Sequence, residues 1–227
     1  DEGFLMVLDR AILPILDAFK PDLIINSAGQ DNHYTDPITN MRISAQGYAL
    51  LNERLAPDIC VLEGGYSIEK ALPYVNVGII LAMAGLDYSH VREPDYDPVS
   101  LRQSSDITKA IEEEVNAVMD LWRDRHEMKK RLVGANRYVK RRKFIYYDTD
   151  DIREQQEETV RVCDDCGGFV MIESAADKGK RIFAVILPGR CCPECRENGE
   201  MFFERTNRGK HNHVYFQDRE RGVFLVK

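Results

Sequence analysis

The chain has 227 residues, of which 44% are hydrophobic, and its formal net charge is −7 at pH 7. A chain of this size can bury one or two cores. It has no apolar run long enough to span a bilayer and no signal-peptide pattern at its start, so a membrane partner is not expected. The negative charge argues against a nucleic-acid footprint over the whole protein and leaves open only a local basic surface.

The first third of the chain alternates between helical and strand-like patterns. Apolar residues recur at helical spacing in three segments, and Pro14 predicts a kink or a restart in the first of them. Two short apolar runs between them are typical of buried strands. Helices are expected at residues 4–19, 44–55 (with Ser44 as N-cap) and 67–85, and strands at residues 22–26 and 59–62. This order predicts a parallel α/β sheet, whose ligands bind beyond the carboxyl ends of the strands.

The middle of the chain is more polar. Residues 86–104 are expected to be irregular, because they are polar and contain two prolines. From residue 107 to about residue 143, an apolar stripe predicts one long helix with a strongly basic end, and the acidic stretch 148–158 predicts a linker. The basic end is interpreted as a solvated surface that complements the helix dipole, with docking of an acidic partner or nucleic acid as the alternative.

The loops after the two predicted strands carry specific motifs. Residues 19–33 read Phe-Lys-Pro-Asp-Leu-Ile-Ile-Asn-Ser-Ala-Gly-Gln-Asp-Asn-His, Asp36-Pro37 follows, and residues 61–66 read Val-Leu-Glu-Gly-Gly-Tyr. Together with residues 43–51, these segments resemble the histone deacetylase family in order and spacing over residues 1–85. That family includes acetylpolyamine amidohydrolases and acetoin-utilisation proteins. The resemblance implies the C-terminal half of an α/β domain with the arginase/deacetylase fold.

The resemblance assigns the chemistry to two residues. Asp31 would be a ligand of the catalytic zinc ion, and Tyr66 would point its hydroxyl at the scissile carbonyl. A zinc ion with an open position lowers the pKa of bound water and polarises the carbonyl, and a phenol stabilises the developing oxyanion. The implied function is a zinc-dependent amidohydrolase acting on acylated lysine or polyamine.

The resemblance implies supporting roles for five further residues. Gly64 and Gly65 would let the backbone approach the acyl-lysine channel closely, and Pro37 would lie near the pocket wall. His33 and Asp36 would orient or brace the loop that carries the zinc ligand.

The sequence also departs from the family. The family takes two further zinc ligands from an Asp-x-His segment and its general base from a His-His pair, both upstream of the matching region. No His-His pair occurs here, and Gln30 stands where the family usually has an apolar residue. The expected partner is therefore an N-terminal half or a second subunit, unless the chain is cut or truncated, and self-association is a further expectation. The alternative is a non-catalytic scaffold or regulatory subunit.

Five of the six cysteines lie late in the sequence. Cys163 and Cys166 form one Cys-x-x-Cys pair and Cys192 and Cys195 form another, with 25 residues between them. This spacing is typical of a structural zinc site with four thiolates and fits a redox pair less well. Cys191 is a spare that could replace its neighbour. Such clustering favours a reducing, cytoplasmic or otherwise intracellular compartment.

The cysteine pairs enclose strand-like segments. Residues 169–172 and 181–187 predict a β-hairpin, and further strands are expected at residues 202–203, 214–216 and 223–226. The pattern resembles a small β-rich zinc ribbon. If the protein is a non-catalytic scaffold, this ribbon is expected to bind protein or nucleic acid. Three domains are expected, at residues 1–104, 105–158 and 159–227.

Overall fold

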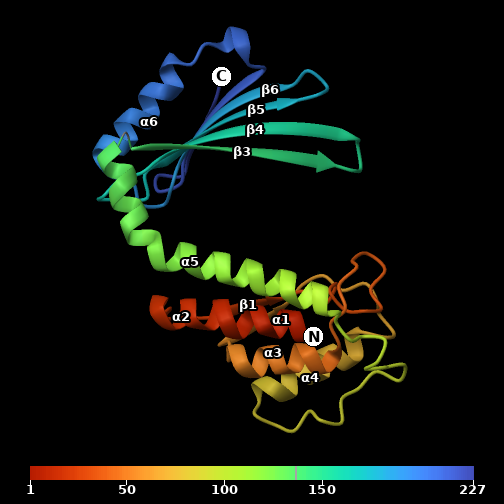
Figure 1. Ribbon diagram of the computed structural model, residues 1–227. Helices are drawn as coiled ribbons and strands as arrows, with labels where there is room; N and C mark the ends of the chain where they lie inside the picture. Colours follow the sequence, from red (N-terminus) through yellow and green to blue (C-terminus); the bar gives the residue numbers. More distant parts are fainter. Residues whose placement is uncertain (136) are drawn as a thin grey trace. The chain divides into compact units, whose positions relative to one another are not determined.

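The computed structural model describes residues 1–135 and 137–227 (Figure 1). The chain divides into two compact units, Asp1–Arg123 and Asp124–Lys227. The division falls within helix α5 (Ser105–Ala135), whereas the sequence suggested boundaries after residues 104 and 158. No helix among the described residues combines the length and the apolarity that crossing a membrane requires.

The N-terminal unit begins with one continuous helical stretch. It consists of α1 (Glu2–Val7), the π-helical turn η1 (Leu8–Ile12) and α2 (Leu13–Phe19). Pro14 lies in the first turn of α2, directly after the π-helical turn. The helix expected over residues 4–19 is confirmed, and regular α-helical geometry resumes next to Pro14, where the sequence predicted a kink or a restart.

A parallel strand pair follows, as the sequence predicted, but the first strand begins three residues later than expected and both strands are largely exposed instead of buried. Strand β1 (Ile25–Ala28) pairs with β2 (Ile59–Leu62), and helix α3 (Ala45–Leu55) connects them. Helix α4 (Leu72–Met83) comes after β2 and packs against α3 (Figure 1). This order and parallel pairing confirm the α/β class of the N-terminal unit.

The core of this unit lies where α3 and α4 meet the two strands. Ser44 caps α3, because its hydroxyl accepts a hydrogen bond of 3.1 Å from the N–H of Gly47. The first part of α5 joins the unit through buried Val115 and an ion pair of 3.0 Å between Arg10 and Glu112. The buried apolar cluster consists of Ala28, Ile43, Ala45, Tyr48, Ala71, Val75, Ile79 and Val91.

The C-terminal unit is a six-stranded sheet with the order β3-β4-β5-β6-β7-β8. All neighbouring pairs are antiparallel except β6 and β7, which are parallel. The strands span Tyr138–Tyr147 (β3), Ile152–Arg161 (β4), Phe169–Ala176 (β5), Arg181–Leu187 (β6), His213–Asp218 (β7) and Val223–Val226 (β8), and the 3-10 turn η2 spans Arg208–Lys210. The predicted hairpin is β5–β6, and the two last predicted strands are β7 and β8.

The expected helix to about residue 143 and the linker after it are wrong. Helix α5 ends at Ala135, the basic run forms β3, and the acidic run forms β4. Opposite charges face each other across the hairpin: Lys140 pairs with Glu157 at 2.6 Å, and Lys143 pairs with Glu158 at 2.7 Å. Such cross-strand pairs favour a hairpin over a separate helix and linker. Residue 136, which the expected helix also covered, lies outside the described residues.

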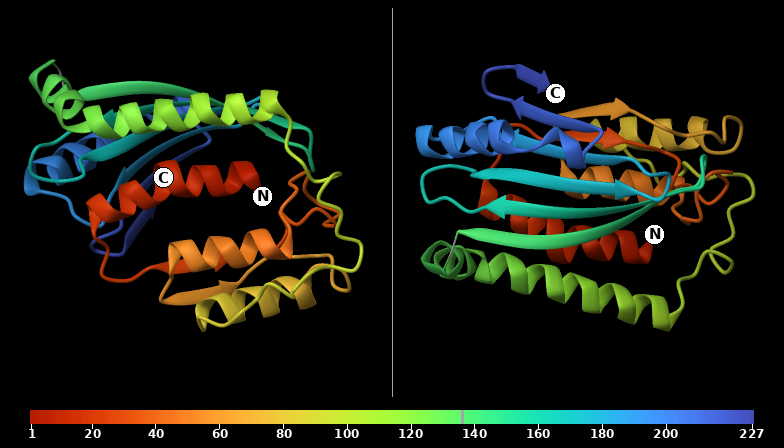
Figure 2. Two further views of the ribbon diagram at one scale, coloured as in Figure 1. Left: turned by 60° about the horizontal axis from the view of Figure 1, so that its bottom comes forward. Right: turned by 90° about the horizontal axis from the view of Figure 1, so that it is seen from above.

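The strand expected at residues 202–203 is also wrong, because helix α6 (Pro193–Arg205) contains them. The helix lies along β5, β6 and β7 (Figure 2). Its Phe202 ring lies 6.0 Å from that of Phe169, measured between centroids. A Cβ on Gly199 would lie only 2.6 Å from a methyl carbon of Leu187, so the glycine permits this close packing.

Asp218, at the end of β7, ties α6 to the sheet. Its carboxylate accepts hydrogen bonds from Arg196 Nε at 3.0 Å and from the N–H groups of Glu220 and Arg221, both at 3.1 Å. Burial opposes the charge, but these bonds outweigh burial and hold the pKa of Asp218 below its ordinary value of 3.8.

Replacing Asp218 by Ala is expected to lower the free energy of unfolding by about 2–3 kcal/mol, because a largely buried Arg196 loses a partner. The lowered pKa means that the contribution is complete above pH 3.8 and is lost as the pH falls through the folded-state pKa. The loss should therefore be the same at pH 7 and pH 5 in urea unfolding. Asp150→Ala, at an exposed turn, is the control, and equal stability of the two variants would contradict the prediction.

Candidate functional site

The two loops that carry the predicted site residues lie side by side. Strands β1 and β2 are parallel, and their pairing ends at Ala28 and Leu62. The loops that follow the two strands therefore begin at the same edge of the sheet. The N–H of Gln30 then donates a hydrogen bond to the carbonyl of Gly64. The strand register and this bond bring the loop of Asp31 next to the loop of Tyr66.

The side chains of Asp31 and Tyr66 approach a common point beside Gly64. A Cβ on this glycine would lie 3.3 Å from Asp31 Oδ2 and 3.4 Å from Tyr66 Oη. The glycine therefore leaves room for a carboxylate and a phenol close to each other. Tyr66 is 53% exposed, so its side chain can be reached by a substrate.

Asp36 holds the backbone of Tyr66. One carboxylate oxygen accepts a hydrogen bond of 2.8 Å from the N–H of Tyr66, and the other accepts one of 2.9 Å from the N–H of Ile38. The side chain is buried, so these bonds compete little with water. Asp36 thus links the two loops directly.

His33 is fully buried beneath the Asp31 loop. Its Nε2 lies 2.6 Å from Oε1 of Glu93, and its Nδ1 accepts a hydrogen bond of 3.2 Å from the N–H of Thr35. Glu93 was not singled out from the sequence, because it lies in the stretch expected to be irregular. A charged residue directly before a proline carries no local signal that it will be buried.

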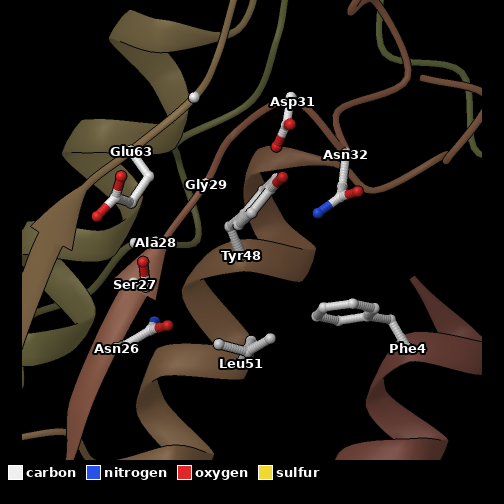
Figure 3. Close-up of a pocket in the computed structure, with 11 residues that line it drawn as sticks. Phe4, Asn26, Ser27, Ala28, Gly29, Asp31, Asn32, Tyr48, Leu51 and Glu63 are labelled. Carbon is white, nitrogen blue, oxygen red and sulfur yellow. The ribbon is translucent and has the colours of Figure 1, made fainter. Parts of the chain in front are cut away.

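A pocket of about 360 Å³ opens beside these loops (Figure 3). Asp31, Asn32 and Tyr48 point into the same space. The Tyr48 hydroxyl is buried with no hydrogen-bond partner among the described residues, and burial raises its pKa above the ordinary value. The lining residues are Phe4, Asn26, Ser27, Ala28, Gly29, Asp31, Asn32, Tyr48, Leu51, Glu63 and Gly64.

Several lining residues were missed from the sequence, and of the predicted site residues only Asp31 and Gly64 line this pocket. Tyr48 fits the apolar stripe of α3 and was assigned to the helix core, so its hydroxyl gave no separate signal. Pro37 is exposed and does not line this pocket. Gly65 lies against Gln30, where a Cβ would come within 2.9 Å of that side chain.

Comparison with known proteins identifies this part of the chain. Residues 1–78 match the family model described as the histone deacetylase domain. This stretch is therefore similar to part of a histone deacetylase domain.

The matching proteins are much longer than the part of them that this chain covers. A protein of Archaeoglobus fulgidus named "Probable deacetylase" is 54% identical over 104 residues, which are 42% of this chain and 29% of that protein. The "Histone deacetylase-like amidohydrolase" of Pseudomonas aeruginosa is 30% identical over 111 residues, 45% of this chain and 29% of that protein. A solved structure titled "Crystal Structure of HDA15 HD domain" is 22% identical, with a TM-score of 0.42, covering 53% of this chain and 32% of that one. The chain therefore spans less than a third of the length of each.

A catalytic zinc site needs about three protein ligands. Among the described residues, the only group of three or more His, Cys, Asp or Glu side chains close enough to hold a metal ion is a cysteine cluster in the other unit. Asp31 and its neighbours do not make a complete catalytic zinc site by themselves.

The cysteine cluster fits a metal ion well. The sulfurs of Cys163, Cys166, Cys192 and Cys195 all lie within 4.8 Å of one another, and those of Cys163 and Cys192 are 3.9 Å apart. Tetrahedral zinc, with Zn–S bonds of about 2.3 Å, places its sulfurs about 3.8 Å apart. The four thiols that the sequence singled out therefore form a group that could hold a metal ion.

Two sulfurs of the cluster accept hydrogen bonds from N–H groups. Arg161 Nε donates to the sulfur of Cys195 at 3.2 Å, and the N–H of Gly168 donates to that of Cys166 at the same distance. Burial opposes ionisation of Cys166, but N–H groups of Cys192 and Gly168 lower its pKa to about 7. Gly168 has a φ of +68°, a left-handed turn at which a Cβ would collide with the carbonyl of Arg161.

The spare Cys191 lies outside the cluster. Its sulfur faces the carbonyl of Gly168 at 3.8 Å, and burial raises the pKa of its thiol to about 11. The structure thus brings Cys192, and not Cys191, to the three other sulfurs.

Proposed function

We propose that residues 1–104 are part of a zinc-dependent amidohydrolase that removes acyl groups from lysine or polyamine nitrogen. The observation that carries the proposal is the approach of Asp31 Oδ2 and Tyr66 Oη to one point beside Gly64, where two parallel strands end. The printed names of the relatives, "Probable deacetylase" and "Histone deacetylase-like amidohydrolase", support this class of reaction.

The residues of this chain have distinct roles in the proposed reaction. Asp31 supplies one ligand to the zinc ion, which when bound provides Lewis-acid polarisation and an activated water. Tyr66 donates a hydrogen bond to the oxygen on which negative charge develops, and Asp36 keeps the backbone of Tyr66 in place. The pocket beside Asp31 lies next to this point.

The remaining ligands and the general base are proposed to come from an N-terminal deacetylase half or a second subunit. Ile25, Ile59, Val61 and Leu62, on the two parallel strands, are exposed. Parallel strands are usually covered on both faces, so this apolar surface supports a further segment packed against the sheet.

The cysteine cluster is proposed to hold a structural zinc ion in the C-terminal unit. Its four thiols fit the geometry of zinc, and thiolate sites of this kind persist where cysteines stay reduced. This supports an intracellular location.

A second candidate is a non-catalytic deacetylase-like scaffold or regulatory subunit. It is favoured by one observation, which is that among the described residues only the cysteines complete a metal site. Both candidates place the same zinc ion in the C-terminal unit, and they differ in the metal expected at Asp31.

An assay of the gene product that contains residues 1–227 tests the proposal. We expect release of acetate from an acetyl-lysine peptide or an acetylated polyamine, loss of this activity on chelation, and recovery with zinc. The zinc content should be two ions per assembled catalytic unit. A folded product that holds only the cysteine-bound ion and releases no acetate would overturn the enzyme and support the scaffold.

A further inference from the structure

We propose that Glu93 is a positioning residue that fixes the loop of Tyr66 from the buried side. The inference rests on the proposed function, because it concerns the placement of the hydroxyl that would meet the substrate. Glu93 lies outside the residues that match the family model, in a segment between α4 and α5 that has no regular structure.

Glu93 is anchored at a buried junction of three segments. Its Oε1 accepts hydrogen bonds from His33 Nε2 at 2.6 Å and from the N–H of Ala45, at the start of α3, at 2.7 Å. The side chains of His33 and Glu93 are both 0% exposed. Burial opposes the charge of Glu93, but these two bonds outweigh it and lower its pKa. Bonds to a buried carboxylate are strong, so this junction is well fixed.

A chain of hydrogen bonds leads from this junction to the residue after Tyr66. Because the N–H of Thr35 donates to His33 Nδ1, this nitrogen is an acceptor and the ring carries its proton on Nε2. The Thr35 hydroxyl, 2.9 Å from the same nitrogen, is then also a donor. Ser67 Oγ lies 2.6 Å from the Thr35 hydroxyl and donates to it. The chain therefore runs from Ser67 through Thr35 and His33 to Glu93.

The segment that carries Glu93 is itself held in place. Gln46 on α3 donates hydrogen bonds of 2.8 Å and 2.6 Å to two carbonyls of residues 88–91. On the exposed side, Asp95 accepts a hydrogen bond of 3.0 Å from Tyr34 and lies 3.5 Å from Lys70 Nζ. The segment thus contacts the loop of Asp31 through His33 and Tyr34 and the loop of Tyr66 through Lys70, and Glu93 forms the buried link.

Three variants of the full gene product separate this role from general stability. Glu93→Ala should lower kcat about 10- to 100-fold with KM changed less than about threefold, because small displacements of a catalytic group are costly. Glu93→Gln keeps an acceptor oxygen for His33 and Ala45 and should retain kcat within about threefold. Glu114→Ala, at an exposed position of α5, should have no effect. An equal loss in the Gln and Ala variants would overturn the proposed hydrogen-bond role.

A double-mutant cycle tests whether Glu93 acts through Tyr66. Glu93→Ala should cause a smaller fold-loss in kcat in a Tyr66→Phe background than in the parent, by a factor of at least about three. The reason is that the hydroxyl that Glu93 positions is already gone. Fully multiplicative effects would show that Glu93 acts independently of Tyr66 and would overturn the inference.

Hydrogen exchange gives a readout that needs no activity. Glu93→Ala should accelerate exchange in peptides covering residues 32–36 and 64–71 but leave the strands β1 and β2 unchanged. Ser67→Ala cuts the chain at its far end and should accelerate exchange in the second peptide alone, which keeps the test available if Glu93→Ala fails to fold. An inactive parent protein would refute the proposed function while leaving this measurement valid. Unchanged exchange in the second peptide of both variants would overturn the positioning role.

Discussion

Cys166→Ser is expected to remove most of the stability of the C-terminal unit. The four sulfurs lie within 4.8 Å of one another, and two of the cysteines belong to the unit's buried core. Structural zinc sites of this type contribute about 10–16 kcal/mol of apparent binding free energy, which is comparable to the whole stability of a domain. Replacing one thiolate by a hydroxyl weakens the proposed zinc site and leaves two buried thiols and the half-buried Cys192 without a cation.

The matched control is Cys191→Ser. Cys191 directly precedes Cys192 of the cluster in the sequence, but its own sulfur lies outside the cluster. Zinc content per chain and hydrogen exchange of β3 to β8 would be measured for both variants. We expect Cys166→Ser to lose zinc and protection throughout the sheet, and Cys191→Ser to keep both. The reverse result would show that Cys191 is the ligand, and protection retained without zinc would show that the sheet is stable without metal.

The cysteine site could be predicted from the sequence because its signal is local. Two residues separate the thiols of each pair, and this short spacing fixes a knuckle regardless of the strands between the pairs. The β3–β4 hairpin could not be predicted in the same way. Four consecutive charges at residues 140–143 interrupt the apolar alternation of β3, and their acidic partners lie on a different strand. The pattern therefore resembled the solvated end of a helix.

The helix α6 was missed for a related reason. Phe202 and Phe203 are adjacent aromatic residues, a pair that favours a strand when it is considered alone. Their relation to Cys195 and Gly199 gives the spacing i, i+4, i+7 and i+8, which is helical. Because the cysteine was assigned to metal binding, it was not counted in the apolar stripe.

In the N-terminal unit, too, features with a local sequence signal could be predicted, whereas a contact between distant residues could not. Asp31 and Tyr66 each follow a strand, and the parallel pairing of the strands brings them together as expected. Glu93 lies 60 residues from His33 in the sequence, and only the tertiary fold buries the pair. A buried carboxylate is stabilised by its partners, which a single sequence does not reveal.

Tyr66→Phe in the full gene product is expected to lower kcat about 10²- to 10³-fold while KM changes little. The phenol and the Asp31 carboxylate approach the same point, so the hydroxyl is placed to donate to an oxygen of a substrate bound there. A hydrogen bond that strengthens as negative charge develops acts on the transition state more than on the bound substrate. Removing one such donor typically costs this much in kcat.

Tyr146→Phe is the control for this substitution. This residue is 58% exposed, close to the 53% of Tyr66, and it lies on β3 in the other unit. Steady-state hydrolysis of an acetyl-lysine peptide should show the loss in kcat for Tyr66→Phe alone. A rise in KM at unchanged kcat would assign Tyr66 to substrate binding, because an interaction made equally in the ground and transition states affects only KM. An equal loss in both variants would mean that the hydroxyl at position 66 has no special place in the reaction.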